Sequence, residues 1–323
     1  MTAATAAFAP QPLRIALLGH GFIGKLHEQA AHACGEHVVR IARSTDDWHA
    51  AATAHDVDAV VIATPNALHH PQALAALGAG KHVLVDKPMA MTVAQSREIV
   101  AAATAANRTL LVGHMWRYRA EVIALRNEVV HGAVGTPVRT RGFGVHAQWG
   151  PGGWFVDPAL AGGGALIDMG IHAIDTARFL LGDPQPTRVT ASLASVHGAE
   201  HGYDRASGID DDGLVLVEWS GGALQLADAW SVVESGWWQP RLEGAEADTE
   251  VFGSAGTRRI WPHLLVDGAM PDGYVHCDLP MYQAQMADFA HCCRTGDTPV
   301  ASADVGLTAM TIVEDAYRSA GWR

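Results

Sequence analysis

A glycine-rich turn near the start of the chain constrains most strongly what this sequence can fold into. The apolar run Leu13–Leu18 has the length of a strand, and Gly19, Gly21 and Gly24 follow it directly, before a helical pattern over Ile23–Ala33. The first glycine permits a tight turn, the second lets a pyrophosphate approach the backbone, and the third lets the helix pack closely on the strand. A plain β-α turn is the alternative interpretation. In this setting, the spacing predicts the first β-α unit of a dinucleotide-binding domain.

The pattern continues as short apolar strands that alternate with helices, which predicts a Rossmann-like, doubly wound parallel sheet. Only the twelve residues Thr45–Asp56 separate the second predicted strand from the third, which leaves room for one helix. The predicted strands are His37–Ala42, Val57–Ala63, His82–Val85 and Thr109–Val112, and the predicted helices are Asp46–Ala54, Pro71–Leu77 and Thr92–Ala106.

Beyond Tyr118 strands and helices no longer alternate regularly, because several strand-like runs follow one another without helices between them. Such a succession indicates a largely antiparallel sheet in a second, α+β domain. We predict a dinucleotide-binding domain over residues 1–118 and a substrate-binding and oligomerisation domain over residues 119–323. The expected strands are 138–145, 187–196, 214–219, 223–232, 250–252 and 258–261, the expected helices are 120–131, 281–294 and 303–319, and residues 198–213 are expected to form a loop.

Composition excludes several classes of protein. The net charge of −12 argues against a nucleic-acid surface, and no apolar run is long enough to span a bilayer. The first twelve residues are rich in Ala and Pro without a basic segment, so they are read as a loose tail and not as a signal peptide. Four cysteines without a Cys-x-x-Cys motif indicate reduced thiols in a cytoplasmic protein. The 18 histidines show no metal-ligand spacing, so no metal is expected.

The stretch from Gly162 to Leu181 carries a polar stripe on an apolar helix. Asp168 and His172 lie four residues apart, and Asp175 follows three residues later. Residues at this spacing share one helix face. A hydrogen-bonded core pair is one interpretation, and an acid/base histidine whose tautomer is set by an aspartate is the other.

The end of the second strand bears on which nicotinamide cofactor would bind. A domain that prefers NAD usually carries Asp or Glu there, to bind the ribose 2′-hydroxyl. This chain has Arg43 and Ser44, which suit a 2′-phosphate better. NADP is therefore favoured over NAD, although Arg43 could equally be a solvated charge.

Three further motifs lie at or near the ends of predicted strands: Ala63–Asn66 with His69, Ala79–Pro88, and Gly113-His114 with Arg117-Tyr118. Together with Gly19-x-Gly21-x-x-Gly24 and Gly162–Asp175, they resemble the Gfo/Idh/MocA family of NAD(P)-dependent oxidoreductases, from about Leu13 to Ala320. The resemblance rests on the set and on no single member of it.

The chain departs from the family at two places. Asp86 stands where the family usually has Glu in its Glu-Lys-Pro motif. The family also normally has a helix, a strand and another helix where this chain has only Thr45–Asp56, so the sheet is expected to be shortened by one strand and one helix. An alternative alignment, in which His37–Ala42 is the later of the two strands, predicts the same shortening.

The resemblance implies hydride transfer between a nicotinamide and a hydroxyl or keto carbon of a sugar, cyclitol or related polyol. The catalytic residues would be Lys87, Asp168 and His172, with His172 as the base, Asp168 orienting it, and Lys87 stabilising the alkoxide. It also implies a homodimer or homotetramer. The cofactor would contact Gly19, Gly21, Phe22, Ile23, Gly24, Arg43, Ser44, Thr64, Pro65, Asn66, His69, Asp86 and Lys87. The substrate would contact Lys87, Trp116, Arg117, Tyr118, Trp154, Asp168 and His172, with Phe155 completing an aromatic wall.

Two other functions remain open at this point. Some relatives cleave glycosides through transient oxidation and regenerate the cofactor in place, which would release an aglycone without net formation of reduced cofactor. The shortened nucleotide domain would also suit a non-catalytic, ligand-binding member of the family with a weakened cofactor site.

Overall fold

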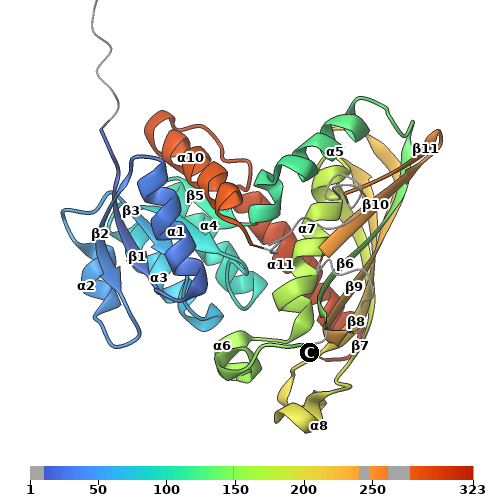
Figure 1. Cartoon of the computed structure of the whole chain (residues 1–323), viewed down its shortest axis with the longest axis horizontal. Helices are drawn as coiled ribbons and strands as arrows, with labels where there is room; N and C mark the ends of the chain where they lie inside the picture. The colour runs from blue at the N-terminus through green and yellow to red at the C-terminus, as the bar shows by residue number, and fades with distance from the viewer. Residues whose placement is uncertain (1–10, 148, 240–246, 261–276, 323) are drawn as a thin grey trace, which may run out of the picture.

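The computed structural model describes residues 11–147, 149–239, 247–260 and 277–322. The chain forms two lobes, each built on its own sheet, and the C-terminal helices lie between them (Figure 1). Continuous apolar runs place the strands of the first sheet in the interior, except for the half-exposed edge strand His37–Ala42, whereas the second sheet alternates buried and exposed residues. The two burial patterns are those of a sheet covered on both faces and of a sheet covered on one face.

The first sheet is parallel and has the strand order β2-β1-β3-β4-β5. This is the dinucleotide-binding order 3-2-1-4-5-6 without its outermost third strand. Between β2 and β3 the chain forms only helix α2 (Trp48–Thr53), which Asp47 caps. The predicted shortening of the sheet is therefore confirmed. The strands are β1 (Arg14–Leu18), β2 (His37–Ala42), β3 (Ala59–Ile62), β4 (His82–Asp86) and β5 (Leu110–Gly113).

The helices of this lobe follow the predicted alternation with one correction. Proline favours the first turn of a helix, which suggested a start at Pro71. Helix α3 instead spans Asn66–Gly78 with Pro71 inside it, because Pro65 already supplies the extended residue that precedes the first turn. The other helices are α1 (Phe22–Ala33) and α4 (Val93–Ala106), which the side chain of Thr92 caps.

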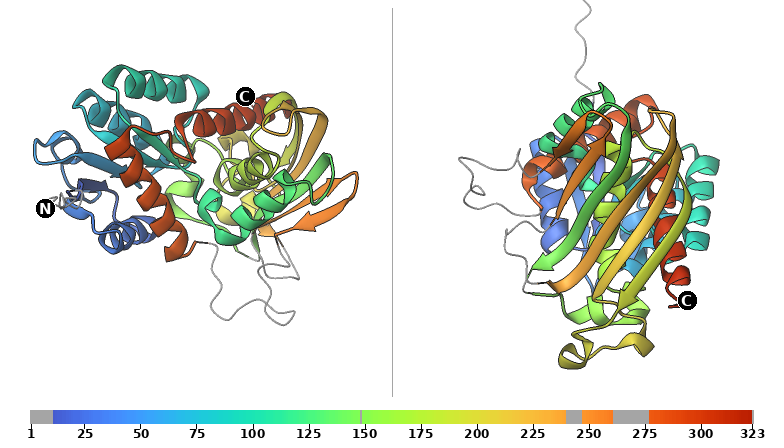
Figure 2. Two further views of the ribbon diagram at one scale, coloured as in Figure 1. Left: turned by 90° about the horizontal axis from the view of Figure 1, so that it is seen from above. Right: turned by 90° about the vertical axis from the view of Figure 1, so that its right-hand side faces the viewer.

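The second sheet has the order β11-β10-β6-β9-β8-β7 and is antiparallel except where β6 pairs with β9. Helices α7 (Ile171–Leu180) and α11 (Ala303–Ser319) cover one face of it, and no helix among the described residues covers the other (Figure 2). The strands are β6 (Pro137–Ala147), β7 (Gln185–Ala194), β8 (Asp212–Gly221), β9 (Leu226–Gln239), β10 (Ala247–Gly253) and β11 (Gly256–Arg259).

Three predictions in this lobe need comment. Strand β9 begins at Leu226 and runs seven residues beyond the predicted end, to Gln239. The predicted loop 198–213 contains helix α8 (Gly198–His201) and the 3-10 turn η4 (Arg205–Ser207), because Asp204 caps the latter in a reciprocal capping box. Trp261, the last residue of a predicted strand, lies outside the described residues.

The predicted helix over Gly162–Leu181 is also not continuous. It is divided into a π-helical turn, η3 (Leu166–Gly170), and helix α7, which begins at Ile171. Gly162 and Gly163 have positive φ angles of 73° and 155°, so a regular helix cannot start there.

Four short elements precede this turn in the chain. They are η1 (Met115–Tyr118), α5 (Ala120–Val130), η2 (Gly153–Val156) and α6 (Pro158–Ala161).

The C-terminal helices join the two lobes. Helix α10 (Leu279–Thr295) packs against α1 of the first lobe, and Ser302 forms a β-bridge with Leu111 of β5. The buried Tyr118 hydroxyl donates to Asp288 at 2.7 Å. A division at residue 118 remains a prediction, and residues 279–322 contact both lobes. None of the described helices has the length and apolar composition needed to cross a membrane.

Candidate active site

The glycine turn between β1 and α1 is shaped as a dinucleotide-binding loop requires. Gly19 has a φ of 89°, and a Cβ there would overlap the carbonyl oxygen of Ala63. A Cβ at Gly24 would likewise overlap the carbonyl oxygen of Gly19. At Gly21, by contrast, a Cβ would meet no atom within 4 Å, and no side chain caps the helix that starts at Phe22. The amides of this helix N-terminus therefore face open space, where a pyrophosphate fits.

The carboxyl ends of β3 and β4 form the next wall of the site. The buried His69 bridges the two loops, since its Nδ1 lies 2.7 Å from the Pro88 carbonyl oxygen and its Nε2 lies 2.8 Å from that of Thr64. Asp86 at the end of β4 contacts helix α1, because Nε2 of the buried His27 on α1 lies 2.9 Å from Asp86 Oδ1. His69 thus has a scaffolding role beside the predicted cofactor contacts.

Lys87 reaches from the first lobe to the second. Its Nζ donates to Oδ1 of Asp168 at 2.9 Å and to the backbone carbonyl of Asp168 at 2.7 Å. An ammonium group has three N–H donors. Two are engaged in these contacts, and one remains for a ligand in the cleft.

The Asp168 carboxylate is held by several donors at once. Besides Lys87, the indole N–H of the buried Trp237 donates to Oδ2 at 3.1 Å, and His146 Nε2 lies 3.5 Å from the same oxygen. Burial alone would raise the pKa of Asp168, but the Lys87 ammonium and His146 outweigh it and hold this pKa well below its usual range. Asp168 is therefore a fixed anion at neutral pH.

The turn that carries Asp168 is fixed by glycines and by a distant carboxylate. The buried Asp210 accepts hydrogen bonds from the backbone amides of Gly164 and Leu166, both at 2.8 Å. A Cβ at Gly144 of β6 would overlap the carbonyl oxygen of Met169. The π-helical turn can therefore lie directly on the sheet, and Asp168 and Met169 reach the cleft.

A cleft of about 730 Å³ brings the predicted residues together. It is lined by Lys87, Asp168 and His172 from the predicted catalytic set, and His172 is 3% exposed. Asp168 contacts Lys87, Trp237 and His146, and its role in orienting His172 stays a prediction. The cofactor side of the lining comprises Gly21, Phe22, Ile23, Thr64, Asn66, His69 and Asp86, and the aromatic side comprises Trp149, Trp154 and Phe155.

Three residues predicted to contact the substrate lie outside the cleft lining. Trp116 is 1% exposed in the main core, and Tyr118 bonds to Asp288. The guanidinium of Arg117 is enclosed by Asp175, through three hydrogen bonds of 2.7–3.0 Å, and by Asp183. None of the three lines the cleft, because η1 directs their side chains into the packing between the lobes.

Five predicted cofactor residues also lie outside the cleft lining. Gly19 and Gly24 serve the close packing of the turn, and Pro65 caps α3. Arg43 and Ser44 follow the carboxyl end of β2 and are exposed. That is the edge of the sheet where the adenosine half of a dinucleotide lies in this fold.

Sequence reasoning missed several residues that line the cleft or contact its lining. His146 was missed because the predicted strand ended at Val145, two residues before the end of β6. Trp237 was missed because the predicted end of β9 was Val232. His27 lies on α1, where its helical spacing gives no sign that it reaches β4. Tyr282 and Trp149 also line the cleft, and no pattern in the sequence singled them out.

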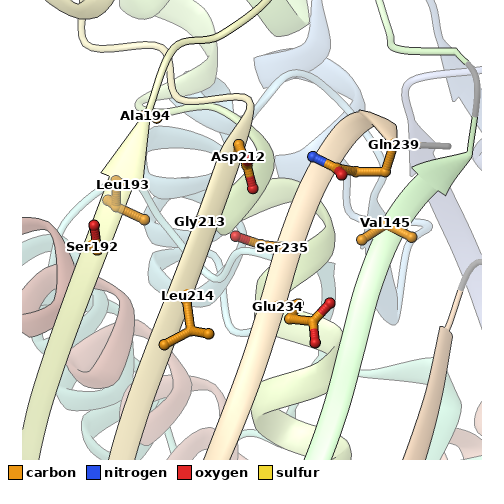
Figure 3. A pocket seen from close by; sticks show the side chains of 10 residues that line it. All are labelled: Val145, Ser192, Leu193, Ala194, Asp212, Gly213, Leu214, Glu234, Ser235 and Gln239. Atoms are coloured by element: carbon orange, nitrogen blue, oxygen red, sulfur yellow. The ribbon is translucent and has the colours of Figure 1, made fainter. Parts of the chain in front are cut away.

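A second hollow, of about 450 Å³, lies on the second sheet and shares no lining residue with the cleft (Figure 3). Two carboxylates, Asp212 and Glu234, stand at its wall, and burial together with the neighbouring Asp211 raises the pKa of Asp212. No predicted catalytic residue reaches it. The described residues contain no group of three or more His, Cys, Asp or Glu side chains placed to hold a metal ion.

Comparisons with known proteins agree with this architecture. The family model for the oxidoreductase family, NAD-binding Rossmann fold, matches residues 21–114, and the GFO/IDH/MocA C-terminal domain matches residues 122–259. A 1,5-anhydro-D-fructose reductase from Ensifer adhaerens is 36% identical over 206 residues, which cover 62% of this chain and 56% of the reductase. A levoglucosan dehydrogenase from Pseudarthrobacter phenanthrenivorans is 29% identical over 265 residues, which cover 68% of this chain and 67% of that enzyme.

Among solved structures, GenD2 from gentamicin A biosynthesis, in complex with NAD, superposes with a TM-score of 0.79. It is 25% identical in sequence, and the match covers 99% of this chain and 97% of that one. The match therefore includes both lobes and the C-terminal helices that join them.

Proposed function

This chain belongs to the Gfo/Idh/MocA family of oxidoreductases, and from that premise we propose that it is an NAD(P)-dependent dehydrogenase or reductase acting on a sugar, cyclitol or related polyol. The observation that carries the proposal is the convergence of Lys87, Asp168 and His172 on the same cleft as the open turn at Gly21. Relatives described as a reductase and a dehydrogenase of sugar derivatives support the substrate class.

The residues that would hold the cofactor follow from the geometry of the turn. The amides at the start of α1 would bind the pyrophosphate, and Thr64, Asn66 and Asp86 would border the nicotinamide half. When bound, the nicotinamide supplies the hydride acceptor or donor. The space beside Gly21 and the uncapped helix start fit such a group.

The side chains of the cleft can perform the proton transfer that must accompany hydride transfer. Asp168 is held ionised by Lys87 and is a poor proton acceptor near neutral pH. His172 is then the base that takes the hydroxyl proton of the substrate, or returns it in the reverse direction. The remaining N–H of Lys87 would bind the substrate oxygen and stabilise its developing negative charge.

For the cofactor we propose a preference for NADP. Arg43 follows the carboxyl end of β2 and has no ion-pair partner among the described residues, whereas Arg40 on the same strand is paired with Asp56 at 2.8 Å. The backbone amide of Arg43 donates to Asp46 at 2.7 Å, so Asp46 fixes the turn there. An unpaired guanidinium at this edge suits a 2′-phosphate.

We also propose that the protein is a homodimer or homotetramer whose subunits pair through the uncovered face of the second sheet. This face carries Leu214, 46% exposed, and Trp230, 37% exposed, on neighbouring strands. The guanidinium of Arg139 lies 5.5 Å from the Trp230 ring centre. Analytical ultracentrifugation of the native protein tests this, and a monomer at all concentrations would contradict it.

Cofactor binding tests the first step of the proposed reaction. The purified protein is titrated with NADPH and with NADH, and nicotinamide fluorescence is followed. We expect saturable binding that Gly21→Ala weakens, because the added methyl group occupies the space of the pyrophosphate. Gly78→Ala, at an exposed helix end where a Cβ also meets no atom, should bind normally. Failure of both cofactors to bind would instead favour a non-catalytic protein.

A further inference from the structure

The cleft is divided into two chemical halves. Its inner half carries charged and hydrogen-bonding groups, among them Lys87, Asp168 and His172. Its other wall is aromatic and consists of Trp149, Trp154 and Phe155, which we call the aromatic wall. A single polyol ring can be held in the inner half through its hydroxyl groups. The aromatic wall calls for a ligand that also has an apolar, flat part.

The aromatic wall is anchored from behind. The rings of Trp154 and Phe155 are stacked with their centres 3.9 Å apart and their planes 24° apart. Phe155 packs against a small core that includes Tyr203 and Trp237. Trp237 also donates its indole N–H to Asp168, so it belongs to the core behind Phe155 and at the same time binds the Asp168 carboxylate. The wall is therefore held in a fixed position relative to the polar half.

Trp149 extends the aromatic wall toward the carboxylate of Asp168. Its ring centre lies 3.7 Å from that of His146, whose Nε2 is 3.5 Å from Asp168 Oδ2. Trp149 lines the cleft, and 45% of its surface remains exposed. Its indole can therefore contact a ligand that already occupies the polar half.

The segment that carries the wall is also attached to the cofactor lobe. The side-chain amide of Asn66 at the start of α3 donates to the carbonyl oxygen of Ala161 in α6 at 2.8 Å. Asp157 caps α6, directly after η2 with its two stacked rings. Helix α6 lies between the two lobes (Figure 1), and the aromatic wall lines the same cleft as the predicted nicotinamide contacts.

We propose that the substrate is a glycoside whose aglycone contains a ring, with the sugar in the polar half and the aglycone ring against the aromatic wall. This rests on the oxidoreductase function proposed above. A ring carbinol of the sugar would lose its C–H hydride to the nicotinamide and its O–H proton to His172, which leaves a ketone. The glycosidic bond stays intact. The aglycone ring is either aromatic or a second sugar, since both present an apolar face to an indole.

Binding of matched glucosides to the complex of the protein with NADPH tests this, because reduced cofactor permits binding without oxidation. Phenyl, methyl and glucosyl β-D-glucosides are titrated by calorimetry. We expect the phenyl glucoside or the disaccharide to bind about tenfold more tightly than the methyl glucoside, as one stacked ring allows. Trp154→Leu and Trp149→Leu should each remove most of that difference. Trp322→Leu, a tryptophan beneath Arg205 and outside the cleft, should preserve it.

The outcomes separate this inference from the proposed function. Equal binding of all three glucosides, or binding of none, would overturn the glycoside assignment. A preference that survives in both tryptophan variants would overturn the role of the aromatic wall. If the glucosides bind with the expected preference but the protein forms no reduced cofactor from NADP⁺ or NAD⁺, the wall is supported and the oxidoreductase function fails alone.

Discussion

Two carboxylates seven residues apart have opposite surroundings in this protein. Asp168 pairs with Lys87 at the cleft, and their side chains are 10% and 19% exposed. Asp175 pairs with Arg117 inside the molecule, and both side chains are 2% exposed. We call the first the open pair and the second the closed pair. Each joins the first lobe to the segment formed by η3, which contains Asp168, and α7, which contains Asp175.

The difference lies in what remains available on the cation. The guanidinium of Arg117 is surrounded by Asp175, Asp183 and the ring of Phe179, whose centre is 4.8 Å away. The ammonium of Lys87 keeps one N–H donor that its two contacts with Asp168 do not use. The closed pair can therefore only stabilise the fold, whereas the open pair can also bind a ligand.

The largest effect on activity is expected at His172, which lies beside the open pair. His172→Asn should lower kcat by about 10²–10⁴-fold, because it removes the base but keeps the size and polarity of the side chain. The free energy of unfolding and the affinity for NADPH should change little. Steady-state kinetics together with denaturant titration measures both. An undiminished kcat would assign the proton transfer to another group.

The two pairs should respond differently to loss of their cations. Lys87→Met should lower kcat by about 10²–10³-fold with a small loss of stability, because the remaining Asp168 keeps Trp237 and His146 near it. Arg117→Met should lower the free energy of unfolding by about 3–5 kcal/mol, because Asp175 is left as an uncompensated buried charge. Denaturant titration of both variants checks this, and equal loss of stability would remove the distinction between open and closed pairs.

The closed pair also predicts a dependence of stability on pH. Burial lowers the pKa of the neighbouring His114 to about 4, although Asp175 opposes the shift. Between that value and the ordinary pKa near 6.5, the unfolded chain binds the proton and the folded chain does not, so stability falls as the pH falls. The loss attributable to His114 is on the order of 3 kcal/mol.

Denaturant titrations of wild type and His114→Gln across this pH range measure the effect. The variant should show a flatter dependence, because glutamine does not titrate. His291→Gln, at an exposed histidine paired with Asp297, should keep the wild-type slope. An unchanged slope in His114→Gln would mean that the histidine is protonated in the folded protein.

The smallest expected effect concerns the edge of the first sheet, far from both pairs. Arg43→Ala should raise KM for NADP⁺ about tenfold and leave KM for NAD⁺ unchanged, because only the 2′-phosphate needs the guanidinium. Arg40→Ala, on the same strand but paired with Asp56, is the control and should leave the preference unchanged. A parallel change of both KM values in Arg43→Ala would argue against 2′-phosphate recognition.

The sequence predicted the parts of this protein that depend on local patterns. The glycine turn, the alternation of strands and helices and the shortened sheet follow from periodicity and spacing, and the structure has them. The contrast between Lys87 and Arg117 could not be predicted, because both are cations just after the end of a buried strand. Their exposure depends on which way η1 and the turn after β4 direct the side chains. The distant contacts of Asp168 with Trp237 and His146 likewise depend on how strands far apart in sequence pair.

The most direct test of the central claim is formation of reduced cofactor by wild type and Lys87→Met, measured by near-ultraviolet absorbance. Each protein is incubated with NADP⁺ or NAD⁺ and a panel of glycosides, free sugars and cyclitols. The account predicts that wild type reduces one cofactor with at least one member of the panel, and that Lys87→Met, although folded, does so at least a hundredfold more slowly. Equal rates in the two proteins, or binding of cofactor without turnover of any member, would contradict it.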